Sequence, residues 1–292
     1  MQKNKKQQQQ SLQIPRSIIA VGKTLQFFSI KLAAKFAQNL FVTPIKFAPP
    51  KREKEMLEKS ISNRIVVPSL KKDIIVYQYG INKSANKTAL LIHGWNGRGT
   101  QLITIATMLM RQGYNIISFD APGHGQSPKT KTTMTEFIAA AFEVEKQFGP
   151  FDLIVGHSLG GMTTINALKD GLKAKQAVII GSGDVVEDVI TDFVQQIELK
   201  PIIGNIIKER FEKQFNQTMS SYCVHEAVKQ INIPLLIIHD EDDLDVNVKA
   251  AYSIKKEAKN AQLLITKGLG HRKILGDKKV IERIMEFVNE VQ

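Results

Sequence analysis

The sequence has little cysteine, no acidic residue in its first 52 positions and no long uninterrupted apolar run. Its single cysteine, Cys223, excludes an intrachain disulfide and is typical of a reducing compartment. Because Tyr222 and Val224 flank this cysteine, we interpret it as a packed side chain and not as a catalytic thiol. A hydrophobic fraction of 43% in 292 residues predicts an ordinary globular chain with one large domain and an appendage.

The net charge of +12 is concentrated at the N-terminal end. Residues 1–52 contain ten lysines and arginines, whereas the remaining residues carry 30 basic and 28 acidic side chains. The body of the protein is therefore nearly neutral, and the charge indicates a partner for the N-terminal segment, not for the active site. No DNA- or RNA-binding motif accompanies the basic residues, so we expect no nucleic-acid partner.

Residues 1–60 are expected to form a basic arm. Residues 1–13 are rich in lysine and glutamine and predict an unstructured start. Between residues 17 and 42, large apolar side chains recur every three or four positions and predict one amphipathic helix. These residues are Leu25, Phe28, Leu32, Phe36 and Leu40. Lysines interrupt the pattern, which argues against a membrane-spanning helix, and no signal-peptide cleavage site follows it.

Two interpretations of the arm have equal support. Residues 1–50 would bind an anionic membrane surface, which predicts a cytoplasmic protein held peripherally at the inner membrane. Alternatively, the apolar stripe packs on the body and the lysines are solvated. A transit peptide fits less well, because lysine and glutamine prevail over arginine and serine.

Residues 61–292 predict an α/β domain with a mainly parallel sheet flanked by helices. Strand-like runs occur at residues 74–79, 88–93, 115–120, 151–156, 176–181, 234–240 and 262–266. Helical patterns occur at residues 101–111, 135–147, 162–169, 247–259 and 278–291. Residues 183–230 contain helical stripes and no strand, which favours a helical cap over the active site; the alternative is a pair of surface helices.

The central motif is a Gly-X-Ser-X-Gly sequence around Ser158. It follows the apolar run at 153–155 and precedes a helical pattern, so a strand, a sharp turn and a helix are expected. Gly156 and Gly160 flank the serine where neighbouring main chain would exclude a β-carbon. Such a turn exposes the serine hydroxyl above the sheet and indicates a nucleophile.

Further motifs follow the order found in the α/β-hydrolase fold. They are Leu91-Ile92-His93-Gly94-Trp95, Asp120-Ala121-Pro122-Gly123-His124-Gly125, the serine motif, His239 to Asp245, and Gly268-Leu269-Gly270-His271. Over about residues 70–290 the sequence resembles serine hydrolases of this fold, the esterase and lipase superfamily. A serine hydroxyl needs a nearby base, and His271, which follows the last predicted strand in a glycine-rich loop, is the best candidate.

The resemblance also implies the remaining site residues. It implies Asp243 as the carboxylate that orients His271, with Asp245 as the second choice, and the backbone N–H groups of Trp95 and Leu159 as the oxyanion hole. The chain departs from the family pattern at Asp240, where a glycine is expected. No cofactor is implied, and the histidines show no metal-ligand spacing, so no metal is expected either.

The sequence does not determine which acyl-transfer reaction the protein catalyses. A carboxylic ester hydrolase acting on a small-molecule acyl substrate is the leading hypothesis, but thioesterases, peptidases, acyltransferases and perhydrolases share the same residues. A non-catalytic binding or sensor protein is the alternative from a different class. The oligomeric state does not follow from the sequence.

Overall fold

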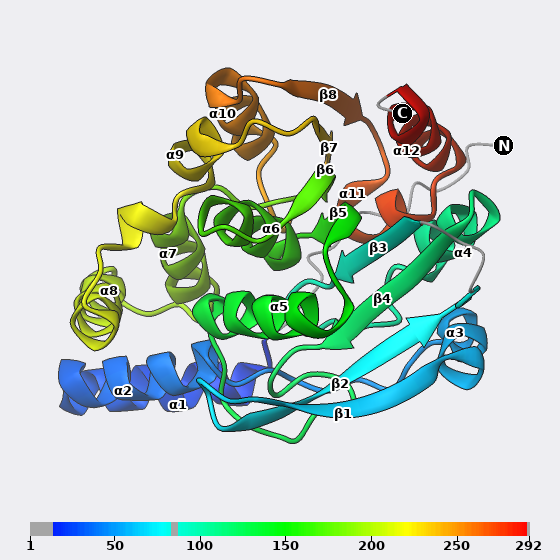
Figure 1. Cartoon of the computed structure of the whole chain (residues 1–292). Coiled ribbons are helices and arrows are strands. Elements are labelled where there is room, and N and C mark those ends of the chain that lie inside the picture. Colours follow the sequence, from blue (N-terminus) through cyan, green and yellow to red (C-terminus); the bar gives the residue numbers. More distant parts are fainter. Residues whose placement is uncertain (1–13, 83–86, 291–292) are drawn as a thin grey trace, which may run out of the picture.

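Eight strands form one twisted sheet in the computed structural model, which describes residues 14–82 and 87–290 (Figure 1). The strands are β1 Ile61–Val67, β2 Lys72–Tyr79, β3 Lys87–Ile92, β4 Tyr114–Asp120, β5 Phe151–His157, β6 Ala174–Ile180, β7 Leu235–Asp240 and β8 Ala261–Thr266. Their order is β1-β2-β4-β3-β5-β6-β7-β8; β2 is antiparallel to β1 and β4, and the other neighbours are parallel.

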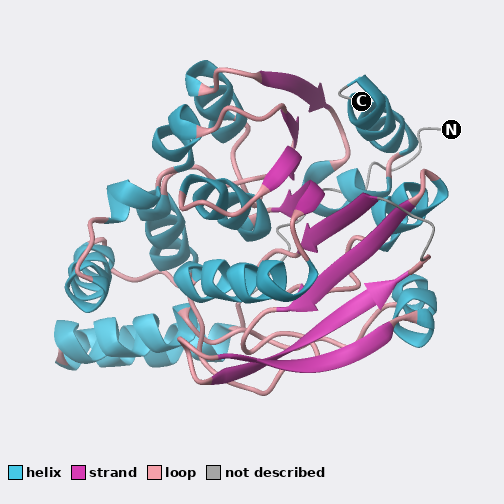
Figure 2. Ribbon diagram, viewed as in Figure 1, coloured by secondary structure: helices cyan, strands magenta, loops and turns pink. Residues whose placement is uncertain are grey.

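Helices cover both faces of this sheet (Figure 2). They are α4 Ile103–Arg111, α5 Met134–Phe148, α6 Leu159–Lys169, α10 Lys249–Glu257, α11 Gly270–Lys273 and α12 Lys278–Glu290. Successive strand residues alternate between the two layers: Leu90 and Ile92 pack toward α5, whereas Ala89 and Leu91 pack toward α4 and α12. The apolar strand runs predicted from the sequence are therefore buried on both sides.

The predicted fold class is confirmed, and each predicted strand and helix of the domain lies within a few residues of its expected position. One strand was not predicted. In β1 only Ile65 and Val67 are buried, because the strand lies at the edge of the sheet, so its sequence lacks a clear alternation. The interval 183–230 contains helices and no strand, as expected: α7 Val186–Gln196, α8 Ile202–Phe215 and α9 Val224–Ala227, with 3₁₀ helices η2 Met219–Tyr222 and η3 Val228–Gln230.

The prediction of one continuous amphipathic helix in the arm is wrong. The chain forms α1 Arg16–Phe28 and α2 Ile30–Phe41, which are separated by Ser29 in an extended conformation. The Ser29 hydroxyl accepts a hydrogen bond from the N–H of Leu32 and caps α2. The two helices pack as a hairpin, since a β-carbon at Gly22 would lie 3.4 Å from Phe36 Cε1. The start of the arm, residues 1–13, lies outside the described residues.

The face of the arm that packs also differs from the expected stripe. Ala33, Ala34 and Ala37 of α2 are completely buried against α7 and α8, in a cluster that includes Ile203 and Ile207. Small residues allow this close approach of two helices, whereas the spacing of large apolar side chains indicated another face. No helix among the described residues is both long enough and apolar enough to cross a bilayer.

Candidate active site

Ser158 lies at the sharp turn between β5 and α6. Its φ of 55° and ψ of −120° are unusual for a residue with a side chain, and its N–H donates to Ile180 O at 2.9 Å. The flanking glycines are required sterically: a β-carbon at Gly156 would collide with the carbonyl oxygen of Gly160, and one at Gly160 with that of Ile92. The turn predicted from the sequence is therefore present, and Ser158 stands at the carboxyl end of the sheet.

The chain order of the sheet explains why this end is hollow. Strands β3 and β5 are neighbours, but after β3 the chain continues on one side of the pair and after β5 on the other. Loops leaving such a switch point diverge and leave a crevice between them. The loop after β3 carries Trp95, and the turn after β5 carries Ser158; a β-carbon at Gly94 would lie 2.9 Å from Ser158 Cβ.

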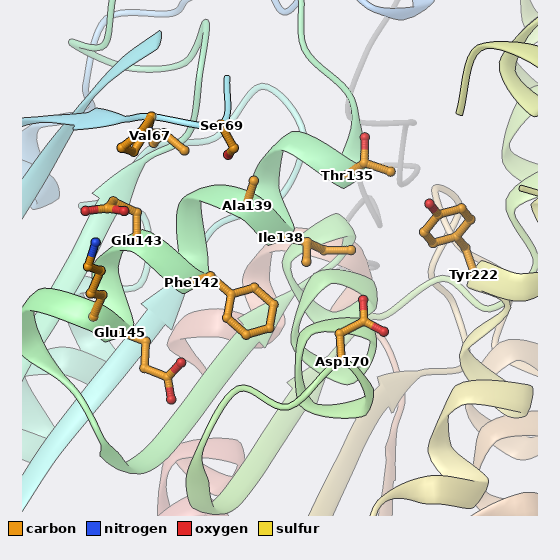
Figure 3. A pocket seen from close by; sticks show the side chains of 12 residues that line it. Val67, Ser69, Thr135, Ile138, Ala139, Phe142, Glu143, Glu145, Asp170 and Tyr222 are labelled. Atoms are coloured by element: carbon orange, nitrogen blue, oxygen red, sulfur yellow. The ribbon is translucent and has the colours of Figure 1, made fainter. Parts of the chain in front are cut away.

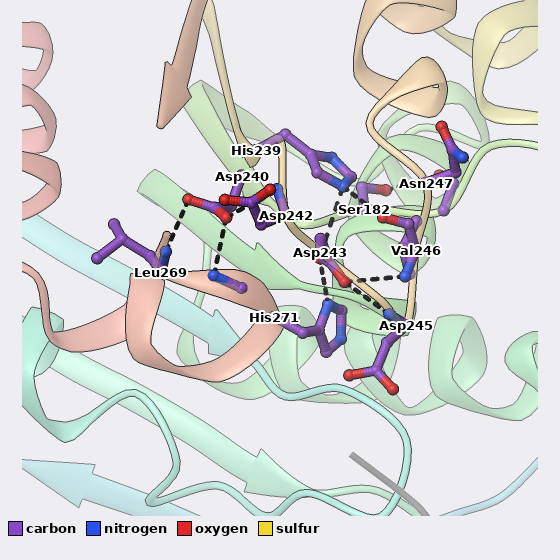
Figure 4. Close-up of polar contacts among 12 residues, drawn as sticks. Ser182, His239, Asp240, Asp242, Asp243, Asp245, Val246, Asn247, Leu269 and His271 are labelled. Carbon is purple, nitrogen blue, oxygen red and sulfur yellow. Dashed lines mark hydrogen bonds and ion pairs between the residues drawn. The ribbon is translucent and has the colours of Figure 1, made fainter. Parts of the chain in front are cut away.

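His271 is bonded to a buried carboxylate (Figure 4). Its Nδ1–H donates to Asp243 Oδ2 at 2.7 Å, and the other oxygen of Asp243 accepts the N–H groups of Asp245 and Val246 at 2.8 and 2.9 Å. Burial acts to raise the pKa of Asp243, but the hydrogen bond from His271 and the backbone donors outweigh it and lower the pKa. Asp243 thus remains ionised beside the imidazole.

Asp240 anchors the loop that carries His271. Its fully buried carboxylate accepts the Thr266 hydroxyl at 2.7 Å and the N–H groups of Leu269 and Gly270 at 3.0 and 2.9 Å (Figure 4). Burial acts to raise the pKa of Asp240, but these donors lower it. The residue that departs from the family pattern therefore fixes the backbone directly before His271.

His157 connects this loop to the serine turn. Its Nε2–H donates to the carbonyl oxygen of His271 at 2.9 Å, and the two rings lie 4.7 Å apart. Burial lowers the pKa of His157 to about 3, so its ring is neutral. The structure thus brings Ser158, His271 and Asp243 together at one site, although Ser158 is at least 85 residues away from the other two along the chain.

Two of the backbone amides lie close to Ser158. Leu159 begins α6 directly after Ser158, and Trp95 follows Gly94; neither N–H donates to an acceptor within the described part of the chain. His93 holds the Trp95 loop, since its Nδ1–H donates to Gly94 O at 2.7 Å and its Nε2 accepts the N–H of Ala121 at 3.0 Å. Both amides thus have no acceptor among the described residues, and the hydrogen bonds of His93 hold the loop that carries Trp95.

A cavity of about 1260 Å³ opens above Ser158. Its walls come from three parts of the chain: the site loops with Trp95, Leu159 and His271, the helices α7 and α8, and the arm. The apolar residues contributed by the last two parts are Ile14, Ile18, Leu40, Phe41, Val186, Val189, Ile190, Phe193, Phe211 and Phe215. Helices α7 and α8 therefore cover the site, as the cap interpretation expects.

The arm also holds the loop around Trp95. The N–H of Ile45 donates to Asn96 Oδ1 at 2.7 Å. Farther along, the buried Glu53 of η1 Lys51–Glu53 accepts Arg98 Nη1 at 3.0 Å and the Thr100 hydroxyl at 2.8 Å; helix α3 Lys54–Lys59 follows. Sequence reasoning missed these contacts, because nothing in the spacing of the arm indicates which loop it touches.

A second hollow lies between the end of β1 and α5 and is shown in Figure 3. Its volume is about 780 Å³, and carboxylates of Glu143, Glu145 and Asp170 lie around an apolar floor that includes Phe142. It contains neither Ser158 nor His271, so we do not assign it to the site.

Asp243, Asp245 and His271 offer potential metal-ligand atoms within 4.8 Å of one another. The contact of Asp243 with His271 is a hydrogen bond of 2.7 Å, and a cation bound by both residues would have to replace its proton. The arrangement is therefore explained by the hydrogen bond.

Comparisons with known proteins agree with this architecture. Residues 88–216 match the sequence model of the α/β hydrolase fold family. The chain has the α/β-hydrolase fold. It also resembles the esterase Pf2001 of Pyrococcus furiosus, with a TM-score of 0.64, 19% identity and coverage of 85% of this chain and 99% of the other. No curated protein matches the sequence.

Two further solved structures of this fold differ in their described activities. A membrane phospholipase A, described as a bacterial virulence factor, has a TM-score of 0.62 and 17% identity, and the match covers 94% of this chain and 96% of the other. A bromoperoxidase of Bacillus anthracis has a TM-score of 0.59 and 16% identity over 78% of this chain and all of the other. At such identities the likeness shows the fold alone, and the reaction is argued from the site.

Proposed function

We propose that the protein is a serine hydrolase that cleaves carboxylic esters through an acyl-enzyme intermediate. The observation that carries this proposal is the buried Asp243–His271 pair, which is held beside Ser158 by the hydrogen bond from His157 to His271 O. The similar structures of an esterase and a phospholipase support ester hydrolysis as the reaction.

The proposed reaction has two halves. His271 Nε2 takes the Ser158 proton while Oγ forms a bond to the ester carbonyl carbon, and the carbonyl oxygen becomes an oxyanion. The oxyanion accepts hydrogen bonds from the Trp95 and Leu159 amides, each worth about 3–4 kcal/mol in related sites. As the C–O bond breaks, the alcohol leaves with the proton from His271. Water then attacks the acyl-enzyme by the same steps and releases the acid and free Ser158.

The proposed substrates carry long acyl chains. The cavity exceeds the usual ligand-pocket range of about 300–1,000 Å³, and its walls above Ser158 are apolar. Each methylene buried there contributes about 0.8 kcal/mol, so kcat/KM would rise up to about fourfold per methylene until the chain fills the space. A panel of p-nitrophenyl esters of increasing chain length measures this, and thioesters and amides in the same panel test the other acyl-transfer reactions.

A fluorophosphonate probe tests the reaction class itself. The wild-type protein should be labelled, and Ser158→Ala should lose both labelling and several orders of magnitude in ester hydrolysis while remaining folded. Ser69→Ala, in the second hollow, is the matched control and should behave as wild type. An unlabelled, inactive wild-type protein would favour the binding or sensor alternative, and an active, folded Ser158→Ala protein would disprove the assigned nucleophile.

A further inference from the structure

The tip of the α1–α2 hairpin presents two phenylalanine rings to solvent. Phe27 is 86% exposed and Phe28 76%, the two largest values among the exposed large apolar side chains that the structure describes, and their ring centroids lie 5.3 Å apart. Val21 and Leu32 flank them on the two helices and are 49% and 52% exposed. In Figure 1 the hairpin lies below α8, at the lower left.

The hairpin is anchored through its other side. The alanine face of α2 is buried against the cap, and Gln26 Oε1 accepts the N–H of Lys200 in the α7–α8 turn at 2.6 Å. Lys23 pairs with Glu198 of the same turn. The exposed rings therefore do not result from a loosely attached helix, because the segment that carries them is held in a defined position.

Two exposed lysines follow these rings on α2, and the hairpin carries no acidic residue. Lys31 and Lys35 are exposed and make no ion pair with any residue in 14–82 or 87–290. Glu198, which faces the hairpin from the cap, is occupied by Lys23. The tip thus combines an apolar centre with a positive margin.

We infer that this tip docks on a bilayer surface that contains anionic phospholipid. Insertion would bury the two rings among the acyl chains, while Lys31 and Lys35 would remain at the phosphate level. A second copy of the chain fits less well. Exposed side chains of this size offer roughly 500 Å², against about 800 Å² per partner in a stable protein interface. Lysines are also depleted at such interfaces.

Docking at the tip would bring the cavity close to the bilayer. Ile18 near the start of α1 and Phe41 at the end of α2 line the cavity, and ten helical residues separate Ile18 from Phe28. At 1.5 Å per residue this is about 15 Å. The hairpin would therefore hold the cavity near the lipid headgroups, at a distance set by its own length.

Vesicle co-sedimentation of the full chain tests this inference without reference to hydrolysis. The protein should pellet with vesicles of phosphatidylcholine mixed with phosphatidylglycerol, pellet far less with pure phosphatidylcholine, and be released as salt increases. Absence of binding to the anionic vesicles would overturn the inference, whether or not the protein hydrolyses esters.

Two double variants locate the contact. Phe27→Ser/Phe28→Ser and Lys31→Glu/Lys35→Glu should each weaken binding by at least about tenfold, because they remove the apolar and the cationic component separately. The matched controls are Ile61→Ser/Val66→Ser in the edge strand β1 and Lys256→Glu/Lys259→Glu at the end of α10 and in the turn after it, which should bind as wild type. Equal binding by all four variants would place the contact elsewhere.

A fluorescence measurement distinguishes insertion from attraction alone. Phe27→Trp should show a blue-shifted emission with anionic vesicles, relative to the wild type, whose only tryptophan is Trp95 in the cavity. If Phe27→Ser/Phe28→Ser instead converts a dimer to a monomer in size-exclusion chromatography and leaves vesicle binding unchanged, the tip is an interface between copies and the inference is wrong.

Discussion

At the scale of single residues, Asp243 is the carboxylate whose loss should most reduce turnover. Asp243→Asn keeps the side-chain volume but removes the charge that stabilises the His271 cation, so kcat should fall by about 10⁴-fold. Asp242→Asn, whose carboxylate is exposed, is the control and should retain wild-type kcat. Asp245→Asn should cause a smaller loss than Asp243→Asn; the reverse order would assign the orienting role to Asp245.

Asp240 should affect stability more than the chemistry. Asp240→Asn replaces one acceptor oxygen with an NH2 group, so either the Leu269 or the Gly270 N–H loses its acceptor, and the free energy of unfolding should fall by about 1–3 kcal/mol. A lower kcat with an unchanged KM should accompany this, because the backbone before His271 loses its anchor. Urea unfolding and steady-state kinetics measure the two effects; an unaltered urea midpoint would contradict the anchoring role.

Sequence motifs identified the residues around Ser158, and they did so for a physical reason. The serine turn requires Gly156 and Gly160 because carbonyl oxygens occupy the space of their β-carbons, so the motif records a steric constraint. No sequence motif indicates the anchoring role of Asp240. Its partners, Thr266 to Gly270, are more than 25 residues away, and their alignment depends on the pairing of β7 with β8.

At the scale of elements, the buried alanine face makes the arm part of the folded core. Ala37→Glu would force a charge between α2 and the cap, which should lower the free energy of unfolding by about 3 kcal/mol or more. Ala20→Glu, on the exposed side of α1, is the matched control and should be nearly neutral. Urea denaturation compares the two; equal midpoints would mean that the arm separates from the cap before the body unfolds.

The arm also shows where periodicity fails as a guide. The recurrence of Leu25, Phe28, Leu32, Phe36 and Leu40 correctly indicated helix but not the break, because serine occurs inside helices as well as at the N-cap position that Ser29 takes here. It did not indicate the face that packs on the cap, which consists of Ala33, Ala34 and Ala37. The spacing of large apolar side chains cannot reveal a packing surface made of Gly22 and alanines. The close packing of α2 on its neighbours nevertheless buries three of its residues completely.

At the scale of the whole molecule, buried neutral histidines should make the protein acid-sensitive. Burial lowers the pKa of His157 to about 3 and that of His124 to about 4, and it lowers the pKa of His93 as well. In the unfolded chain these histidines have their ordinary pKa of 6.5. The unfolded state thus binds more protons from about pH 6.5 down to about pH 4, so stability falls as pH falls through this window.

The free energy of unfolding should fall by up to about 1.4 kcal/mol per pH unit for each such histidine. Asp120 acts in the opposite direction, since burial raises its pKa and the folded state takes up that proton first. Urea midpoints between about pH 7 and about pH 5 measure the net effect. His124→Gln should flatten the curve; a variant whose midpoint depends on pH as strongly as that of the wild type would show that this ring does not cause the loss of stability.

The mixed origin of the cavity walls has a thermodynamic consequence. Because Ile14, Ile18 and Phe41 line the same space as Phe193 and Phe211, a non-hydrolysable lipid analogue filling it would contact both the beginning and the middle of the chain. Its binding energy would add to the unfolding free energy of the whole protein, by about 2.7 kcal/mol at a hundredfold excess over Kd. Amide hydrogens of α2 and α8 would then exchange more slowly together, so the occupied cavity would act as a reversible cross-link between two segments that share no covalent bond.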